Sequence, residues 1–356
     1  FTTVYLGFNW EYATSQDLST RDLRNYSTVY LVNVPSVTEA AAANLTRYVQ
    51  DGGGVGIFLG PDVNPKEYNQ YLYADGKGIL PVPLPDRPSE PLTEEQRFKK
   101  LFSFSKKVLL KDRAAKSHGA LAGIYLDDRG KPIRDDDYEK FFNFVMINQY
   151  WPIQRIGKWR DDRSVQELYC LPNDRPMADF EGPARQISGR IPLDDPDFEK
   201  SKAALTYFRN EINRVVLTSD PLAVLAGVFD RFLGDARGDE ATEAALREFW
   251  ANPKTSELKA DTARLRDAVK FGDPLYLAKT MGRGRVTAMM TTAGEQWNDW
   301  ATGPGRPSYL PLIKEMENYL SGGGAEDNVL VGNPIDLKLD AARYKDVVRR
   351  TLMTLE

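Results

Sequence analysis

The order strand, helix, strand near the N-terminus is the feature that most limits how this chain can fold. Residues 28–34 (TVYLVNV) and 55–59 (VGIFL) are β-rich runs. Between them, residues 37–51 carry apolar side chains four apart, after a Pro-Ser start signal and before three glycines that can end a helix. This order is typical of a parallel sheet that is covered by helices. We therefore predict an α/β fold.

A change of pattern divides the chain into segments. Residues 195–270 have the pattern of several consecutive helices, whereas residues 274–291 again contain β-rich runs. We therefore predict that a mainly helical insertion interrupts the α/β domain. The predicted segments are the first part of the α/β domain, the insertion, the second part of the domain, and an extension or the start of a following module, at residues 1–194, 195–270, 271–325 and 326–356.

The insertion has an apolar stripe of its own. Leu205, Phe208 and Ile212 are spaced three and four residues apart, which places them on one face of a helix. We expect these side chains to lie against the α/β core. We also expect the insertion to add no central strand to the sheet.

Composition excludes several classes of function. The formal net charge is −4 and no stretch concentrates basic residues, so nucleic acid is not an expected partner. The chain has one cysteine, Cys170, and one histidine, His118, which excludes an intrachain disulfide and a zinc site built from Cys and His alone. No apolar run approaches the roughly 20 residues of a membrane-spanning helix. The first residue is Phe1, so we expect an excised piece of a longer protein.

The sharpest motif is Gly56-Ile57-Phe58-Leu59-Gly60, a strand that runs into a turn bounded by glycines. It resembles the Gly-x-Cys-x-Gly nucleophile elbow of class I glutamine amidotransferases, where small flanking residues permit a strained turn that presents the cysteine. The resemblance implies a flavodoxin-like parallel sheet flanked by helices. Phe58 stands where those enzymes have the cysteine, and a phenyl ring neither attacks a carbonyl nor accepts a proton. Gly56, Phe58 and Gly60 therefore mark a degenerate elbow.

Residues 272–300 carry a second resemblance. They are similar to the C-terminal strand and helix of amidotransferase-like domains in bacterial membrane proteins that also bear an aerotolerance-type N-terminal region and a von Willebrand factor A domain. In catalytic relatives this strand end supplies the histidine base, but residues 291–295 read TTAGE. Both halves of the catalytic pair are thus absent, and no catalytic residue, metal site or cofactor is expected.

The two resemblances imply a non-catalytic binding or scaffolding domain of a larger membrane-anchored bacterial protein. Its partners would be another protein or other domains of the same chain, with membrane contact only through segments outside the given sequence. The resemblance implies the periplasmic face, with the cytoplasm as the alternative. It does not identify a small-molecule ligand.

Two other functions stay open. A carboxylate-based hydrolase would use Glu295 or the Asp clusters at residues 127–128, 135–137 and 194–195, which are otherwise typical of turns and helix caps. A carbohydrate-binding module would use exposed aromatic faces. Side chains just beyond the last strand lie where open α/β sheets bind ligands. The candidate pocket-lining residues are Glu295, Trp297, Asn298 and Trp300.

Two further motifs have simpler interpretations. Cys170 lies in a strand-like context, and a lone cysteine is usually an inert buried thiol, so we do not expect it to form a catalytic pair with His118. Residues 282–285 (GRGR) precede a strand, whereas a phosphate-binding loop opens onto a helix. We therefore predict a hairpin turn at residues 282–285.

Overall fold

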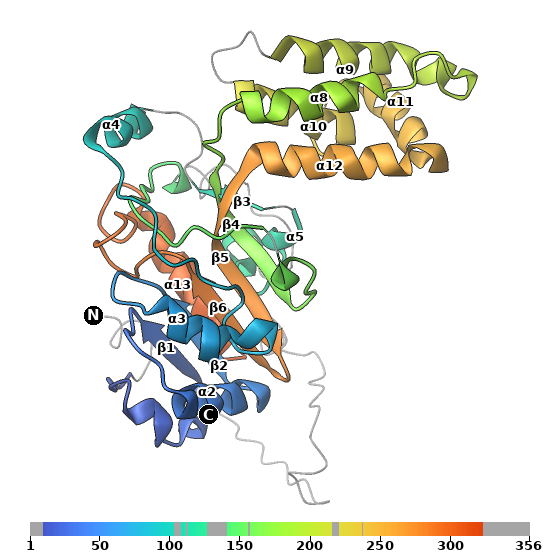
Figure 1. Ribbon diagram of the computed structural model, residues 1–356. Helices are drawn as coiled ribbons and strands as arrows, with labels where there is room; N and C mark the ends of the chain where they lie inside the picture. The colour runs from blue at the N-terminus through green and yellow to red at the C-terminus, as the bar shows by residue number, and fades with distance from the viewer. Residues whose placement is uncertain are drawn as a thin grey trace, which may run out of the picture. The chain divides into compact units, whose positions relative to one another are not determined.

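The computed structural model describes residues 10–102, 108–111, 113–126, 141–155, 157–215, 221–236 and 238–322 (Figure 1). Within these residues the chain forms one six-stranded sheet in the order β1-β2-β6-β5-β4-β3, with helices on both faces. This confirms the predicted α/β fold. The strands are β1 (Thr28–Val32), β2 (Gly54–Phe58), β3 (Leu109–Leu110), β4 (Val165–Pro172), β5 (Phe271–Met281) and β6 (Gly284–Met289).

The sheet is mixed in direction. Strands β1, β2 and β6 are mutually parallel, and the strand, helix, strand pattern predicts the parallel pair of β1 and β2. Strand β5 pairs antiparallel to β6, and β4 pairs antiparallel to β5, so β4 points the same way as β1 again. The change of direction between β5 and β6 follows from a hairpin. Only Gly282 and Arg283 separate these two strands, and Gly282 has a φ of +60°. The predicted hairpin turn is confirmed.

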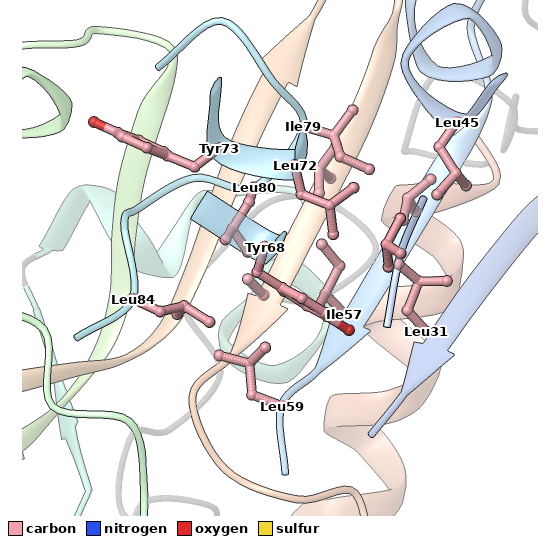
Figure 2. Packing of buried hydrophobic residues seen from close by; sticks show 14 of the residues in the cluster. Leu31, Leu45, Ile57, Leu59, Tyr68, Leu72, Tyr73, Ile79, Leu80 and Leu84 are labelled. Atoms are coloured by element: carbon pink, nitrogen blue, oxygen red, sulfur yellow. The ribbon is translucent and has the colours of Figure 1, made fainter. Parts of the chain in front are cut away.

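One face of the sheet is covered by α2 (Glu39–Gln50) and by a π-helical turn, Tyr68–Tyr73, which continues the short helix α3 (Pro65–Glu67). Figure 2 shows how Ile57 from the sheet meets side chains of α2 and of the π-helical turn, among them Leu45 and Tyr68. All three side chains are at most 1% exposed. Burial of such residues supplies most of the driving force for this layer.

The opposite face is covered by α5 (Arg113–Lys116), α6 (Ala122–Tyr125) and α13 (Arg306–Leu320). Helix α13 contributes Leu312 and Met316 to a second core, which contains Phe58 from β2. The sheet is therefore buried on both faces around β2 and β6, as is typical of parallel strands.

A helical module lies between β4 and β5 in the sequence (Figure 1). Among the described residues of 195–270 there is no strand, in agreement with the sequence analysis. Its helices begin at Ala178, earlier than the insertion expected from Asp195. They are α8 (Ala178–Gly189), α9 (Lys202–Arg214), α10 (Pro221–Leu233), α11 (Glu240–Ala251) and α12 (Ser256–Lys270).

The helical module has a core of its own. Leu205, Phe208 and Ile212 are each at most 3% exposed, and they pack among other helical residues of this module rather than against the sheet. The prediction that they face the α/β core is therefore wrong. An apolar stripe identifies the buried face of a helix but not the element that covers it.

The remaining elements are short or lie at the periphery. They are α4 (Glu94–Phe102) and 3₁₀ turns at Asp17–Ser19, Leu23–Asn25, Ala74–Gly76, Lys158–Arg160, Pro196–Ser201 and Pro253–Thr255. None of the helices in the described part of the chain is both long enough and apolar enough to cross a membrane. The extension predicted at residues 326–356 lies outside the described residues, and the predicted segment boundaries stay predictions.

Candidate functional site

Phe58 occupies the nucleophile position of the elbow-like motif. It is the last residue of β2, which lies between β1 and β6 and runs parallel to both. Its side chain is 4% exposed and belongs to the core under α13. The motif therefore lies at the carboxyl end of an inner parallel strand, where open α/β sheets place their ligand sites.

The backbone at Phe58 differs from a strained elbow. In the described residues the non-glycine residues with positive φ are Asn33, Ala74 and Asp75, and Phe58 is not among them. Beyond Phe58 the pairing with β6 continues for one more residue, because the Leu59 N–H donates to the Met289 carbonyl at 3.1 Å. A nucleophile elbow holds its nucleophile in a strained turn. That strain is absent at Phe58, and the chain turns only at residues 61–62, before α3.

The glycines of the motif are explained by close neighbours. A Cβ on Gly56 would lie 2.4 Å from the ring of Tyr30, and a Cβ on Gly60 would lie 2.3 Å from Asn33 Oδ1. Contacts this short are not tolerated without movement. Packing against β1 and the turn that follows it thus accounts for both glycines.

Asn33 holds the turn after β1 in place. Its φ of +49° is left-handed, a conformation that Asn adopts more readily than most residues. Its N–H donates to the Phe58 carbonyl at 2.9 Å. Its side chain donates to Asp62 Oδ2 at 2.7 Å and accepts from the Asp62 N–H at 3.1 Å. Sequence analysis missed this residue, although an Asn directly after a β-rich run is a usable signal for such a turn.

The segment directly after β6 carries two threonines. Thr291 Oγ1 donates to the Gln149 carbonyl at 3.0 Å, and Thr292 Oγ1 donates to the Gly294 carbonyl at 2.7 Å. The Asn298 amide donates to the Thr292 carbonyl at 2.8 Å and accepts from the Trp300 N–H at 3.0 Å. These polar groups are buried and bind one another, so they fix the loop after β6.

The four candidate pocket-lining residues do not share one opening. Glu295 is exposed, whereas Trp297, Asn298 and Trp300 are 3%, 2% and 1% exposed. Trp297 lies in the core on the α2 face, 6.5 Å from the ring of Trp151. Trp300 lies in the core on the α13 face, where its Nε1 donates to Ser308 Oγ at 2.9 Å. The two indole rings are therefore structural, and neither offers a face to a sugar.

Trp151, which the sequence analysis did not identify, covers the loop that begins at Gly60. Trp151 is 1% exposed, and its Nε1 donates to the Gly60 carbonyl at 3.2 Å. Its backbone N–H donates to the Met290 carbonyl at 2.8 Å. The side chain thus covers the strand ends of β2 and β6 on the α2 face.

The acidic clusters give no support to a two-carboxylate site. Asp195 caps the 3₁₀ turn at Pro196–Ser201, because its Oδ1 accepts from the Asp197 N–H at 3.0 Å. The clusters at residues 127–128 and 135–137 lie outside the described residues. In the part of the chain that the structure describes, no three His, Cys, Asp or Glu side chains are grouped to hold a metal ion.

Cys170 and His118 have separate partners. Cys170 is fully buried and donates to Glu167 Oε2 at 3.3 Å; burial and then the Glu167 charge raise the pKa of its thiol. A raised pKa keeps the sulfur protonated and unreactive. His118 Nδ1 accepts from the Ala120 N–H at 3.2 Å, and burial lowers the pKa of His118 to about 4. No hydrogen bond joins the two residues.

A surface cavity of about 440 Å³ lies in the helical module, away from the strand ends. Its lining comes from α8 and α12 and includes an ion pair between Arg190 and Asp261 at 2.5 Å. The remaining lining residues are Pro183, Gln186, Ile187 and Leu265.

Comparisons with known proteins add no relative. No family model matches this chain, and neither a curated protein nor a solved structure matches it.

Proposed function

We propose that this chain is a non-catalytic, amidotransferase-like domain that serves binding or scaffolding in a larger membrane-anchored bacterial protein. The proposal rests on the burial of Phe58. Its phenyl side chain lies at the strand end where an amidotransferase has its cysteine. Covalent glutamine chemistry needs a nucleophile and a base within hydrogen-bond reach. Phe58 is neither, and its ring packs in the core under α13.

The surroundings of Phe58 support the same proposal. The threonine hydroxyls that follow β6 donate to backbone carbonyls, and Trp151 covers the turn after β2. The remaining histidine and cysteine of the chain have other partners and shifted pKa values that disfavour reactivity at neutral pH. The chain thus keeps an α/β sheet of the kind that the resemblance implies, without the catalytic pair.

The location and partners in the proposal rest on the resemblance of residues 272–300. We propose a position on the periplasmic face, with other proteins or other domains of the same polypeptide as partners. Membrane attachment would come from segments outside the given sequence. The cytoplasm is the alternative location.

A glutaminase assay tests the catalytic half of the proposal. Ammonia release from glutamine is measured for the chain and for Phe58→Cys, with a heat-unfolded sample as the blank. Neither protein is expected to exceed the blank, because the variant thiol has no base beside it and a free thiol of pKa about 8.5 is mostly protonated at neutral pH. Glutamine hydrolysis by the unsubstituted chain would contradict the proposal, and hydrolysis by the variant alone would reveal a base that the structure does not indicate.

A protease-accessibility experiment tests the location. The full-length gene product is followed by an antibody against this segment in intact cells, in cells with a permeabilised outer membrane, and in lysed cells. Digestion that begins once the outer membrane is permeabilised is expected for the periplasmic face. Protection until the inner membrane is broken would instead establish the cytoplasmic alternative.

A further inference from the structure

Three side-chain hydroxyls lie in the core on the α13 face of the sheet. They belong to Tyr276 on β5, Thr287 on β6 and Tyr319 near the end of α13, and we call them the hydroxyl cluster. The three residues are 0%, 0% and 6% exposed. Within the part of the chain that the structure describes, none of these hydroxyls has a hydrogen-bond partner. A hydroxyl that loses its bonds to solvent and gains none in return is costly to bury.

The pairing of β5 with β6 places two of the hydroxyls on the same face of the sheet. Tyr276 pairs with Met289, and Thr287 is two residues before Met289 on β6. Thr287 is therefore a diagonal neighbour of Tyr276, at a spacing that long side chains can span. Tyr276 and Met289 both lie in the core under α13, and side chains two residues apart on a strand point to the same side. Thr287 thus faces α13 as well.

Tyr319 reaches the same place from the opposite layer. Its ring centre lies 5.1 Å from the guanidinium of Arg285 and 4.8 Å from the ring of His118, and these contacts fix the position of the ring. Burial raises the pKa of the Tyr276 hydroxyl, the nearby Tyr319 raises it further, and the Thr287 hydroxyl lowers it. The three groups are therefore close enough to influence one another.

Two charged side chains near the hydroxyl cluster bind other groups. Arg285 Nη1 donates to the backbone carbonyl of Tyr319 at 2.8 Å. Glu315 also raises the pKa of Tyr276, but its Oε2 accepts from the Gly123 N–H at 3.0 Å. A direct bond between two hydroxyls of the cluster would still leave the third without a partner. The described side chains therefore do not satisfy the whole cluster.

We infer that the hydroxyls of Tyr276, Thr287 and Tyr319 bind one buried water molecule between the sheet and α13. A water molecule donates two hydrogen bonds and accepts two, and buried waters typically make about three such bonds to buried polar groups. Holding one water costs less free energy than burying three unpaired hydroxyls. The water joins β5 and β6 to α13. This site is independent of the proposed function.

A crystal structure of the chain tests the inference directly. We expect electron density for one water within about 2.5–3.0 Å of at least two of the three hydroxyl oxygens, the usual range for such bonds. Hydroxyls that bond only to one another or to other protein groups would overturn the inference. Density for a larger molecule at the cluster would overturn the assignment to water.

Oxygen-17 magnetic relaxation dispersion provides a second test, because it counts long-lived buried waters in solution. The double variant Tyr276→Phe/Tyr319→Phe keeps both rings and leaves one hydroxyl, which is too few to hold a buried water. The count is expected to fall by one relative to the unsubstituted chain. An unchanged count in the folded double variant would contradict the inference.

Tyr68→Phe is the matched control for this experiment. Tyr68 is 0% exposed, and its hydroxyl donates directly to the Val34 carbonyl at 2.8 Å. Removal of this hydroxyl should leave the number of long-lived waters unchanged. An equal loss of one water in Tyr68→Phe would show that the change is not specific to the hydroxyl cluster, which would also count against the inference.

Discussion

A Cβ added to Gly60 would lie 2.3 Å from Asn33 Oδ1, the atom that accepts the backbone N–H of Asp62. The end of β2 and the turn after β1 thus fit together only because one of the two residues has no side chain. Asn33 has a left-handed φ of +49°, so both the conformation and the space at this contact are restricted. The contact joins the two strand ends next to Phe58.

The first prediction follows from this contact. Gly60→Ala is expected to destabilise the fold by about 1–3 kcal/mol, as overpacking typically does. Asn33→Gly removes the clashing amide and also relieves the left-handed backbone, so it should tolerate the added methyl group. In a double-mutant cycle by chemical denaturation, the double variant should be more stable than the sum of the single effects. Additive effects would show that the two positions do not touch.

The second prediction concerns Phe58 as a core residue. Phe58→Ala is expected to lower the free energy of unfolding by about 3–5 kcal/mol, because truncation leaves a cavity under α13. Phe144, which is 54% exposed, provides the matched control, and Phe144→Ala should change stability by less than about 0.5 kcal/mol. Chemical denaturation measures both variants. Similar values for the two would mean that Phe58 is not packed as described.

The third prediction uses two neighbouring aromatic residues of α9. Phe208 is 1% exposed and lies in the core of the helical module, whereas Tyr207 is 45% exposed. Phe208→Ala is expected to cost about 3–5 kcal/mol, and Tyr207→Ala far less. Thermal unfolding of the two variants compares them directly. If Tyr207→Ala were the more damaging change, the buried face of α9 would have to be reassigned.

The fourth prediction concerns acid stability. The pKa of His118 is lowered from 6.5 to about 4, first by burial and then by the charge of Arg285. At pH values between about 4 and 6.5, His118 is protonated in the unfolded chain and neutral in the folded chain. Stability should therefore be unaffected by His118 above pH 6.5 and should fall as the pH drops from about 6.5 toward 4.

His118→Asn is the matched variant for this prediction. Its side-chain oxygen can still accept the Ala120 N–H, but the residue no longer titrates. Urea denaturation at several pH values should show a smaller loss of stability between pH 6.5 and 4 in the variant than in the unsubstituted chain. Equal losses would show that other groups account for the acid sensitivity.

The β-rich runs and the apolar spacing predicted the strands and helix of the α/β core, because each pattern depends only on residues close together in the sequence. Helix α2 lies where the apolar spacing places it, and Thr38 caps its start by accepting from the Ala41 N–H at 3.2 Å. The GRGR hairpin followed from the position of its glycines before a strand. That hairpin implies that β5 runs antiparallel to β6. The antiparallel pairing of β4 with β5 did not follow from any local pattern, because the helical module separates the two strands in the sequence.

Contacts between distant segments could not be predicted in the same way. The spacing of Leu205, Phe208 and Ile212 identifies a buried face, but only the assembled helices show that it packs inside the helical module. Trp297 and Trp300 were placed correctly just beyond the last strand. Their assignment to opposite faces of the sheet depends on how the loop from Thr291 onward is tied, through hydrogen bonds that no local pattern indicates.

The helical module joins the sheet at two adjacent positions, since Pro172 at the end of β4 pairs with Phe271 at the start of β5. The chain therefore leaves the sheet at the end of β4 and returns to it at the start of β5, at neighbouring positions of one antiparallel strand pair. In evolutionary terms, a short connection between these two residues would turn β4 and β5 into an ordinary hairpin and leave every strand pairing intact. The module can thus be gained, lost or exchanged for another without any change in the order of the sheet.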